Sequence, residues 1–349
     1  MGLEGDSCKI KGMVISLLED TVIRVESNVN CRACSMPGHI SYVDMSDRLF
    51  NVKGFWNIKK CSRLKCGTYW LDPMPVEEDI HIAYMDYFTH DSFLQEVPPR
   101  ENILYKVARG IVARISGLIL KKSINIDAQR LSLSNLKLDE DVPGVLFEVG
   151  CGSGDFLARM HDRGWNVEGV DSDPEAIKTA RGRHGLTVYS GKMENLNLPD
   201  SKFDVVTMSH VIEHVYDPIA LLQECFRVLK PSGKLVIVTP NASSLGHQMY
   251  KENWFHLDPP RHISIYSNTS LGAIVKASGF NTVKVMTSAA NAEGVLRGSC
   301  HIKKYGKHSM CEPFKIYEVV KYLALQFYEH ILVSCGKPVG EDLVCIAHK

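Results

Sequence analysis

The chain has 349 residues, a formal net charge of +0 and 45% hydrophobic residues. This length exceeds one typical domain, so we expect a catalytic unit with an appended module. The balanced charge, without a concentrated basic block, argues against a nucleic-acid partner held through phosphate contacts. We see no apolar stretch long enough for a membrane span and no export signal. The 11 cysteines then favour a reducing, cytoplasmic setting with free or metal-bound thiols.

Two pairs of cysteines near the N-terminus have the spacing of metal ligands. Cys31 and Cys34 enclose two residues, and Cys61 and Cys66 enclose four. Two such pairs can converge and present four thiolates to a zinc ion in tetrahedral geometry. The second pair is spaced more widely than in the tightest zinc ribbons, so unliganded core cysteines remain the alternative. We predict a zinc-ribbon-like module within residues 1–75, with structural Zn²⁺.

Residues 76–140 are expected to form a mainly helical linker region. Between positions 103 and 119 apolar residues recur at helical spacing, and basic residues share the same stretch. We expect this helix to pack its apolar side on the neighbouring domain and to expose its charges. Contact with a membrane surface or a lipid-linked substrate is the alternative.

A glycine-rich turn follows the next apolar run. Residues 145–149 predict a buried strand, after which Gly150, Gly152 and Gly154 stand at alternate positions. Glycine lets the backbone turn sharply and approach a ligand closely. The next predicted strand ends in Asp171, whose carboxylate can accept hydrogen bonds from a ribose diol. A nucleoside-bearing cofactor is therefore expected at the carboxyl ends of two adjacent parallel strands.

The residues around the glycines distinguish between cofactors. A dinucleotide fingerprint would have a third glycine where this chain has Asp155, and a carboxylate there would repel a pyrophosphate. Glu148 precedes the turn, and an acidic residue at that place suits a cationic ligand end, such as the amino group of a methionyl moiety. The pattern Glu-x-Gly-x-Gly-x-Gly resembles that of the class I S-adenosylmethionine-dependent methyltransferases. The resemblance implies S-adenosyl-L-methionine as the cofactor.

Three further segments continue the resemblance in the expected order. They span residues 191–206, 208–218 and 228–240, each at a predicted junction between a strand and a helix. The resemblance implies that the cofactor contacts the glycine turn, the end of the second strand, the segment after Gly191 and the end of the fourth strand. The residues assigned in this way are Glu148, Val149, Gly150, Cys151, Gly152, Ser153, Gly154, Asp171, Ser172, Met193, Glu194, Ser209 and His210.

The methyltransferase-like domain is expected to span residues 141–349. Strands are predicted at about 145–149, 166–170, 186–189, 203–208, 234–239, 281–287 and 342–348. The resemblance implies an α/β, Rossmann-like fold: a seven-stranded, mostly parallel sheet with helices on both faces, closed by an antiparallel last strand. A helical insertion at about 289–340, with a helix over 313–333, is expected to cover the cleft or a partner subunit, as in a homodimer.

The first candidate segment for catalysis is His210-x-x-Glu213-His214. In a helical turn these side chains share one face, so two imidazoles and a carboxylate could bind a divalent metal. The ubiquinone-pathway O-methyltransferases are similar in motif, and they have an acidic residue where this chain has His210. That departure weakens the analogy with a magnesium-like site, which prefers oxygen ligands. The alternatives are that Glu213 and His214 order the cofactor loop, or that His214 acts as a general base.

The second candidate segment is residues 254–262, which follow the fifth predicted strand. Consecutive prolines stiffen it, and His256 and His262 are candidates for acid–base work or acceptor contact. An ion pair between Asp258 and Arg261 that pins the loop is the structural alternative. The block Leu-Asp-Pro-Pro-Arg-His resembles one in bacterial methyltransferases associated with sugar or surface-polysaccharide pathways, which implies a glycosyl or lipid-linked acceptor.

These patterns predict transfer of a methyl group from S-adenosylmethionine to a small-molecule acceptor, such as a sugar, a glycolipid or a polysaccharide-pathway intermediate. The predicted catalytic residues are His210, His214, His256 and His262. A non-catalytic S-adenosylmethionine-binding or regulatory protein is the first alternative, because no single base stands out. A nicotinamide-dependent oxidoreductase is the second, and Asp155 disfavours it.

Overall fold

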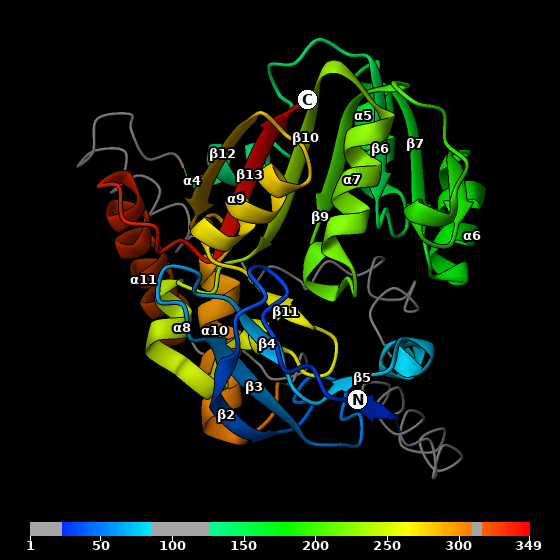
Figure 1. Ribbon diagram of the computed structural model, residues 1–349. Coiled ribbons are helices and arrows are strands. Elements are labelled where there is room, and N and C mark those ends of the chain that lie inside the picture. Colours follow the sequence, from blue (N-terminus) through cyan, green and yellow to red (C-terminus); the bar gives the residue numbers. More distant parts are fainter. Residues whose placement is uncertain (1–22, 86–125, 309–315) are drawn as a thin grey trace, which may run out of the picture.

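The computed structural model describes residues 23–85, 126–308 and 316–349 of the chain. The apolar repeat at 103–119 and the start of the 313–333 helix lie outside the described residues. Two sheets organise the fold, a larger one at the top of Figure 1 and a smaller one below it.

The larger sheet has seven strands in the order β12-β13-β10-β9-β6-β7-β8. Strands β10, β9, β6, β7 and β8 run parallel to one another, whereas β13 runs antiparallel to both β10 and β12. The bounds are β6 Val145–Val149, β7 Asn166–Asp171, β8 Thr187–Ser190, β9 Phe203–Ser209, β10 Leu229–Pro240, β12 Thr282–Ser288 and β13 Asp342–His348. The predicted Rossmann-like sheet is therefore confirmed, although β13 lies inside it and does not close an edge.

One strand begins earlier than the sequence predicts. The helix before it ends at Val228, and β10 starts at Leu229, five positions before the predicted start at 234. Leu229 already pairs with Phe203, after which the register shifts before regular pairing resumes at Lys234. The Pro231-Ser232-Gly233 segment, where a turn would be expected, is thus an irregularity within the strand.

Helices cover both faces of the larger sheet, as Figure 1 shows for α7 and α9 on one of them. Apolar side chains of α7 and α9 share one core with the sheet, and those of α4, α5 and α6 share the other. The bounds are α4 Ile126–Ser134, α5 Asp155–Asp162, α6 Pro174–His184, α7 Pro218–Val228 and α9 Asn268–Ala277. Both α6 and α7 begin at an Asp-Pro pair, in which the aspartate (Asp173 or Asp217) accepts a hydrogen bond from a first-turn amide.

The smaller sheet combines strands of the N-terminal module with one strand from the C-terminal half of the chain. Its order is β11-β4-β3-β2, with β2 Gly38–Met45, β3 Trp56–Cys61, β4 Tyr69–Leu71 and β11 Ser264–Ile265. A two-stranded ribbon, β1 Val25–Glu26 with β5 Met74–Pro75, and the 3₁₀ helix η2 Glu77–Tyr84 complete the module. Trp56 and Leu71 share a buried core with Trp254 and Leu296, so the module is packed against the C-terminal part of the chain.

The segment between β12 and β13 contains α10 Ala292–Tyr305 and α11 Ile316–Ser334. Helix α10 packs against both α11 and α8 Leu245–Tyr250, at the left of Figure 1. Short 3₁₀ turns lie in the loops of the fold. They are η4 Met193–Asn195, η5 Ile212–His214, η6 Lys251–Asn253 and η7 Phe255–Leu257. Within the described ranges, no helix is long and apolar enough to cross a bilayer.

Candidate active site

The glycine-rich turn joins the end of β6 to the start of α5. Its three glycines have positive φ, +67° at Gly150, +52° at Gly152 and +82° at Gly154, a region that other residues disfavour. A Cβ at Gly150 would lie 2.5 Å from Val211, and one at Gly154 would lie 2.8 Å from Leu186. A Cβ at Gly152 would meet nothing within 4 Å. The turn is therefore tightly packed on two sides and open at Gly152, where a ligand can approach the backbone.

Two carboxylates flank this opening. Asp171 accepts hydrogen bonds from the amides of Gly152 at 2.7 Å and Asp173 at 2.9 Å, so it holds the glycine turn to the end of β7. Burial raises the pKa of Asp171, and these amides oppose the rise. Glu148 is 5% exposed, its Oε2 has no hydrogen-bond partner among the described residues, and burial raises its pKa well above the usual value. A cationic ligand group beside Glu148 would favour its charged form, as the amino group of S-adenosylmethionine would.

The other predicted cofactor residues lie in the core, at strand ends or on the surface. Cys151 packs against Gly169, where an added Cβ would lie 2.9 Å from its own Cβ, so Cys151 acts as a small side chain that fits. The Met193 side chain packs in the core, with its Sδ 3.8 Å from the Cys225 Sγ, so a ligand would meet only its backbone. The other residues that the sequence assigned to the cofactor are Val149, Ser153, Ser172, Glu194 and Ser209.

The four predicted catalytic histidines come together from two segments of the chain. His210 and His214 follow β9, whereas His256 and His262 precede β11. Ring centroids are 5.9 Å apart for His210 and His256, 6.3 Å for His256 and His262, and 4.7 Å for His214 and His262. The cluster adjoins the glycine turn, because Val211 is the residue that a Cβ at Gly150 would strike.

Backbone carbonyls determine which nitrogen carries the proton in two of these rings. The Nδ1 of His214 lies 3.0 Å from the Arg261 carbonyl, and the Nδ1 of His262 lies 2.7 Å from the His256 carbonyl. A carbonyl oxygen can only accept, so each Nδ1 donates and each Nε2 keeps a lone pair. Burial lowers the pKa of both His214 and His262 to about 4. The Tyr84 hydroxyl, which the sequence analysis missed, lies 2.8 Å from the His214 Nδ1 and brings η2 of the N-terminal module to the cluster.

His210 differs from the other three histidines. Its Nδ1 lies 3.3 Å from a Glu213 oxygen, and its Nε2 lies 3.9 Å from an Asp342 oxygen. Burial alone would lower its pKa, but Glu213 and Asp342 raise it to about 9. His210 is therefore an imidazolium at neutral pH and unsuited to accept a proton. Asp342 was also missed, because an acidic residue at the start of the last strand has no local pattern that links it to β9.

The set of groups that could hold a metal differs from the predicted one. Residues 212–214 form a single 3₁₀ turn, and His210 stands before it with a φ of +55°. Glu213, His214 and His262 each offer one ligand atom, and these atoms all lie within 4.8 Å of one another. His262 thus takes the place that helical spacing assigned to His210.

Arg261 anchors the 254–262 loop to the N-terminal module. Its guanidinium donates to both Asp258 and Asp47, at 2.9 Å to each, and to the Ala83 carbonyl at 3.2 Å. The ion pair between Asp258 and Arg261, which was the structural alternative for this loop, is present, and Asp47 is a third member that lies far away in the sequence. Arg261 is 0% exposed, so the network is shielded from water.

The four predicted zinc ligands form one cluster. The sulfur atoms of Cys31, Cys34, Cys61 and Cys66 all lie within 4.8 Å of one another. Two of these pairs, Cys31 with Cys66 and Cys34 with Cys61, are 3.7 and 3.5 Å apart. These separations are close to the roughly 3.8 Å that tetrahedral zinc–sulfur bonds of about 2.3 Å require.

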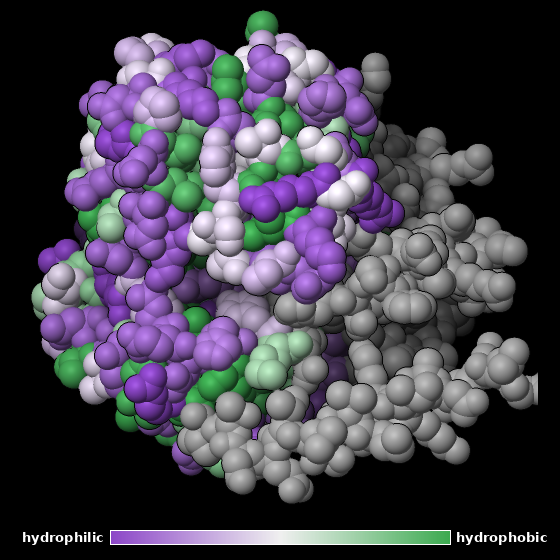
Figure 2. Space-filling model, turned by 90° about the vertical axis from the view of Figure 1, so that its right-hand side faces the viewer, coloured by the Kyte–Doolittle hydropathy of each residue, from purple (hydrophilic) through white to green (hydrophobic). Residues whose placement is uncertain are grey.

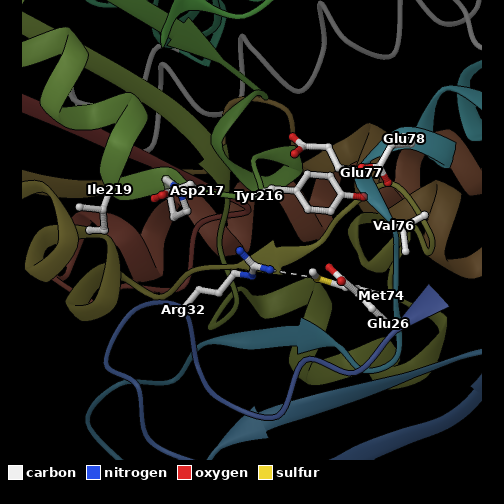
Figure 3. Close-up of a pocket in the computed structure, with 10 residues that line it drawn as sticks. Glu26, Arg32, Met74, Val76, Glu77, Glu78, Tyr216, Asp217 and Ile219 are labelled. Carbon is white, nitrogen blue, oxygen red and sulfur yellow. Dashed lines mark hydrogen bonds between the residues drawn. The ribbon is translucent and has the colours of Figure 1, made fainter. Parts of the chain in front are cut away.

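A cavity of about 580 Å³ lies between the N-terminal module and the start of α7. Figure 2 shows the molecule hollowed between its upper and lower halves, and Figure 3 shows the side chains of the cavity. The Arg32 guanidinium points into the cavity, where it donates to the Met74 sulfur at 3.1 Å and lies 6.0 Å from the centre of the Tyr216 ring. The remaining lining residues are Glu26, Val76, Glu77, Glu78, Asp217, Pro218 and Ile219.

Part of the chain is similar to known proteins. Residues 126–285 match a protein family described as a methyltransferase domain. Residues 126–285 carry a methyltransferase domain. The match extends from α4 into β12 and so includes the glycine turn and all four histidines of the cluster.

The curated homologues of this methyltransferase domain are named methyltransferases. A probable S-adenosylmethionine-dependent methyltransferase of Mycolicibacterium smegmatis is 37% identical over 97 residues, 28% of this chain and 38% of the relative. A ubiquinone biosynthesis O-methyltransferase of Xanthomonas oryzae pv. oryzae is 38% identical over 119 residues, 32% of this chain and 49% of the relative. The chain spans less than half the length of these relatives. A solved S-adenosylmethionine-dependent methyltransferase from Archaeoglobus fulgidus aligns with a TM-score of 0.44 and 22% identity, over 67% of this chain and 98% of that one.

Proposed function

We propose that the protein transfers a methyl group from S-adenosylmethionine to a small-molecule acceptor. One observation carries the proposal: the glycine turn after β6, open at Gly152, adjoins the four-histidine cluster at the end of the neighbouring strand β9. Donor and acceptor would therefore be held side by side, and such alignment supplies most of the rate of an in-line displacement. The bound cofactor would supply an electrophilic methyl group on a sulfonium.

We assign a separate role to each group of residues in this site. Glu148 and Asp171 would hold the amino and ribose groups of the cofactor, and the backbone at Gly152 would admit it. His256 is the candidate general base, because its Nε2 is buried without a hydrogen-bond partner among the described residues and burial keeps the ring neutral. His214 and His262 would line the acceptor side of the site. A hydroxylated acceptor such as a sugar or glycolipid suits a polar cluster of this kind.

Calorimetry with S-adenosylhomocysteine and with NADH tests the donor assignment. We expect S-adenosylhomocysteine to bind with micromolar affinity, about −8 kcal/mol, and NADH not to bind. Formation of S-adenosylhomocysteine is then measured with free, nucleotide-linked and lipid-linked sugars. Failure to bind S-adenosylhomocysteine would contradict the proposal, whereas binding without turnover on any acceptor would support the regulatory alternative.

We also propose that Cys31, Cys34, Cys61 and Cys66 hold a structural zinc ion. The ion would fix the two cysteine loops beside the methyltransferase domain, where the Ser267 hydroxyl donates to the Cys66 carbonyl at 2.6 Å. We expect Cys31→Ser and Cys66→Ser each to lower the zinc content by about one ion per chain, measured by elemental analysis. Cys335→Ser, at an exposed cysteine, is the control and should change nothing. Unchanged zinc in both ligand variants would exclude this site.

A further inference from the structure

The histidine cluster contains three groups arranged as metal ligands. Glu213 and His214 come from η5 and His262 from the loop before β11, and the ligand atoms that they offer lie within 4.8 Å of one another. Glu213 is 0% exposed, and one of its oxygens accepts a hydrogen bond from the Thr239 hydroxyl at 2.8 Å. Its other oxygen lies toward the histidines, 3.3 Å from the His210 Nδ1.

The hydrogen bonds behind the two imidazoles are those of metal-binding histidines. His214 and His262 each direct Nδ1 at a backbone carbonyl, of Arg261 and His256 respectively. Such a bond fixes the orientation of the ring and leaves the opposite nitrogen as an acceptor, which is how proteins prepare histidine ligands. The Asp258 carboxylate, 3.9 Å from the His262 Nε2, is held by Arg261 and adds negative charge around the set.

We infer that Glu213, His214 and His262 bind a divalent transition-metal ion. Two imidazole nitrogens and one carboxylate oxygen suit zinc, manganese, cobalt or ferrous iron better than magnesium, which prefers oxygen ligands. Three protein ligands leave coordination positions open. This ligand set differs from the one that helical spacing predicted, because His210 pairs with Glu213 and Asp342 and is replaced by His262.

The open positions indicate the class of acceptor. The set lies at the end of β9, beside the glycine turn, so the ion would lie where the acceptor is proposed to bind. An acceptor with two neighbouring oxygens, such as a vicinal diol or a hydroxy acid, would chelate the ion and be oriented by it. This role rests on the proposed function, whereas binding of the ion does not.

Cobalt titration of protein that holds one zinc ion per chain, at the cysteine cluster, tests the inference without any assay of activity. We expect Co²⁺ to bind and to produce visible ligand-field bands without the near-ultraviolet charge transfer of cobalt–thiolate bonds. His262→Gln is expected to weaken cobalt binding by about 100-fold or more, since loss of even a supporting partner costs 10–100-fold. His210→Gln is the matched control, because it alters the same cluster outside the ligand set and should retain the bands.

The outcomes separate this inference from the proposed function. S-adenosylhomocysteine binding is measured on the same samples and should persist in His262→Gln, and circular dichroism shows that each variant is folded. Absence of cobalt binding in the unaltered protein, a spectrum with thiolate bands only, or loss of binding in His210→Gln but not in His262→Gln overturns the ligand set. Cobalt binding without S-adenosylhomocysteine binding would leave the metal site standing and refute the donor assignment.

Discussion

Replacement of Arg261 by methionine is expected to lower the free energy of unfolding by about 3–5 kcal/mol. The guanidinium is 0% exposed and is shared by Asp47 and Asp258, so its loss leaves two buried carboxylates without their counter-charge. The Ala83 carbonyl would also lose a donor. The effect is measured by urea unfolding followed by circular dichroism.

Arg227→Met provides the matched control for this prediction. Arg227 also pairs with two acids, Asp200 and Glu224, but its side chain is 36% exposed. Solvent screens such pairs, so we expect Arg227→Met to lower the free energy of unfolding by less than about 1 kcal/mol. Similar losses in the two variants would show that the network around Arg261 does not hold the 254–262 loop to the module.

Gly152→Ala is expected to weaken S-adenosylhomocysteine binding by about tenfold or more, which is at least about 1.4 kcal/mol. The new methyl group would project into the space that is open at Gly152, where the ligand is proposed to approach the backbone. The positive φ of +52° adds strain of about 1–2 kcal/mol to the folded state. Calorimetry measures the affinity, and thermal unfolding measures the strain.

The control for Gly152→Ala reproduces the strain at a position outside the glycine turn. Gly185 follows α6, has a φ of +64°, and an added Cβ would likewise meet nothing within 4 Å. We expect Gly185→Ala to lower stability by a similar amount and to leave the affinity for S-adenosylhomocysteine unchanged. Equal loss of affinity in the two variants would mean that strain, and not occupation of the ligand space, is responsible.

Local patterns in the sequence were sufficient to predict the strands of the larger sheet and the glycine turn. Each buried strand is a short apolar run bounded by polar or glycine residues, and the Asp-Pro pairs mark the starts of α6 and α7. These signals depend on residues that are adjacent in the chain. The start of β10 was misplaced because Leu229 joins the strand through its pairing with Phe203, which no local rule contains.

The candidate site was predictable in its residue types but not in its arrangement. The motifs identified the histidines after β9 and those in the 254–262 loop as candidate site residues. Helical spacing, however, grouped His210 with Glu213 and His214 as metal ligands. The left-handed backbone at His210 and its pairing with Asp342 change that grouping and bring in His262. Tertiary packing overrides helical spacing here, because η5 is a single 3₁₀ turn.

The sequence by itself predicted a glycine turn for a nucleoside-bearing cofactor and a cluster of four cysteines, since the glycines, the acidic residues beside them and the cysteine pairs depend on short-range geometry. The tertiary structure decided which distant groups meet. It joined β11 to β4, Arg261 to Asp47, and Tyr84 to His214. Such contacts link segments that are far apart along the chain, and their free energy comes from burial and charge pairing in the folded state. For that reason they leave no periodic pattern in the sequence.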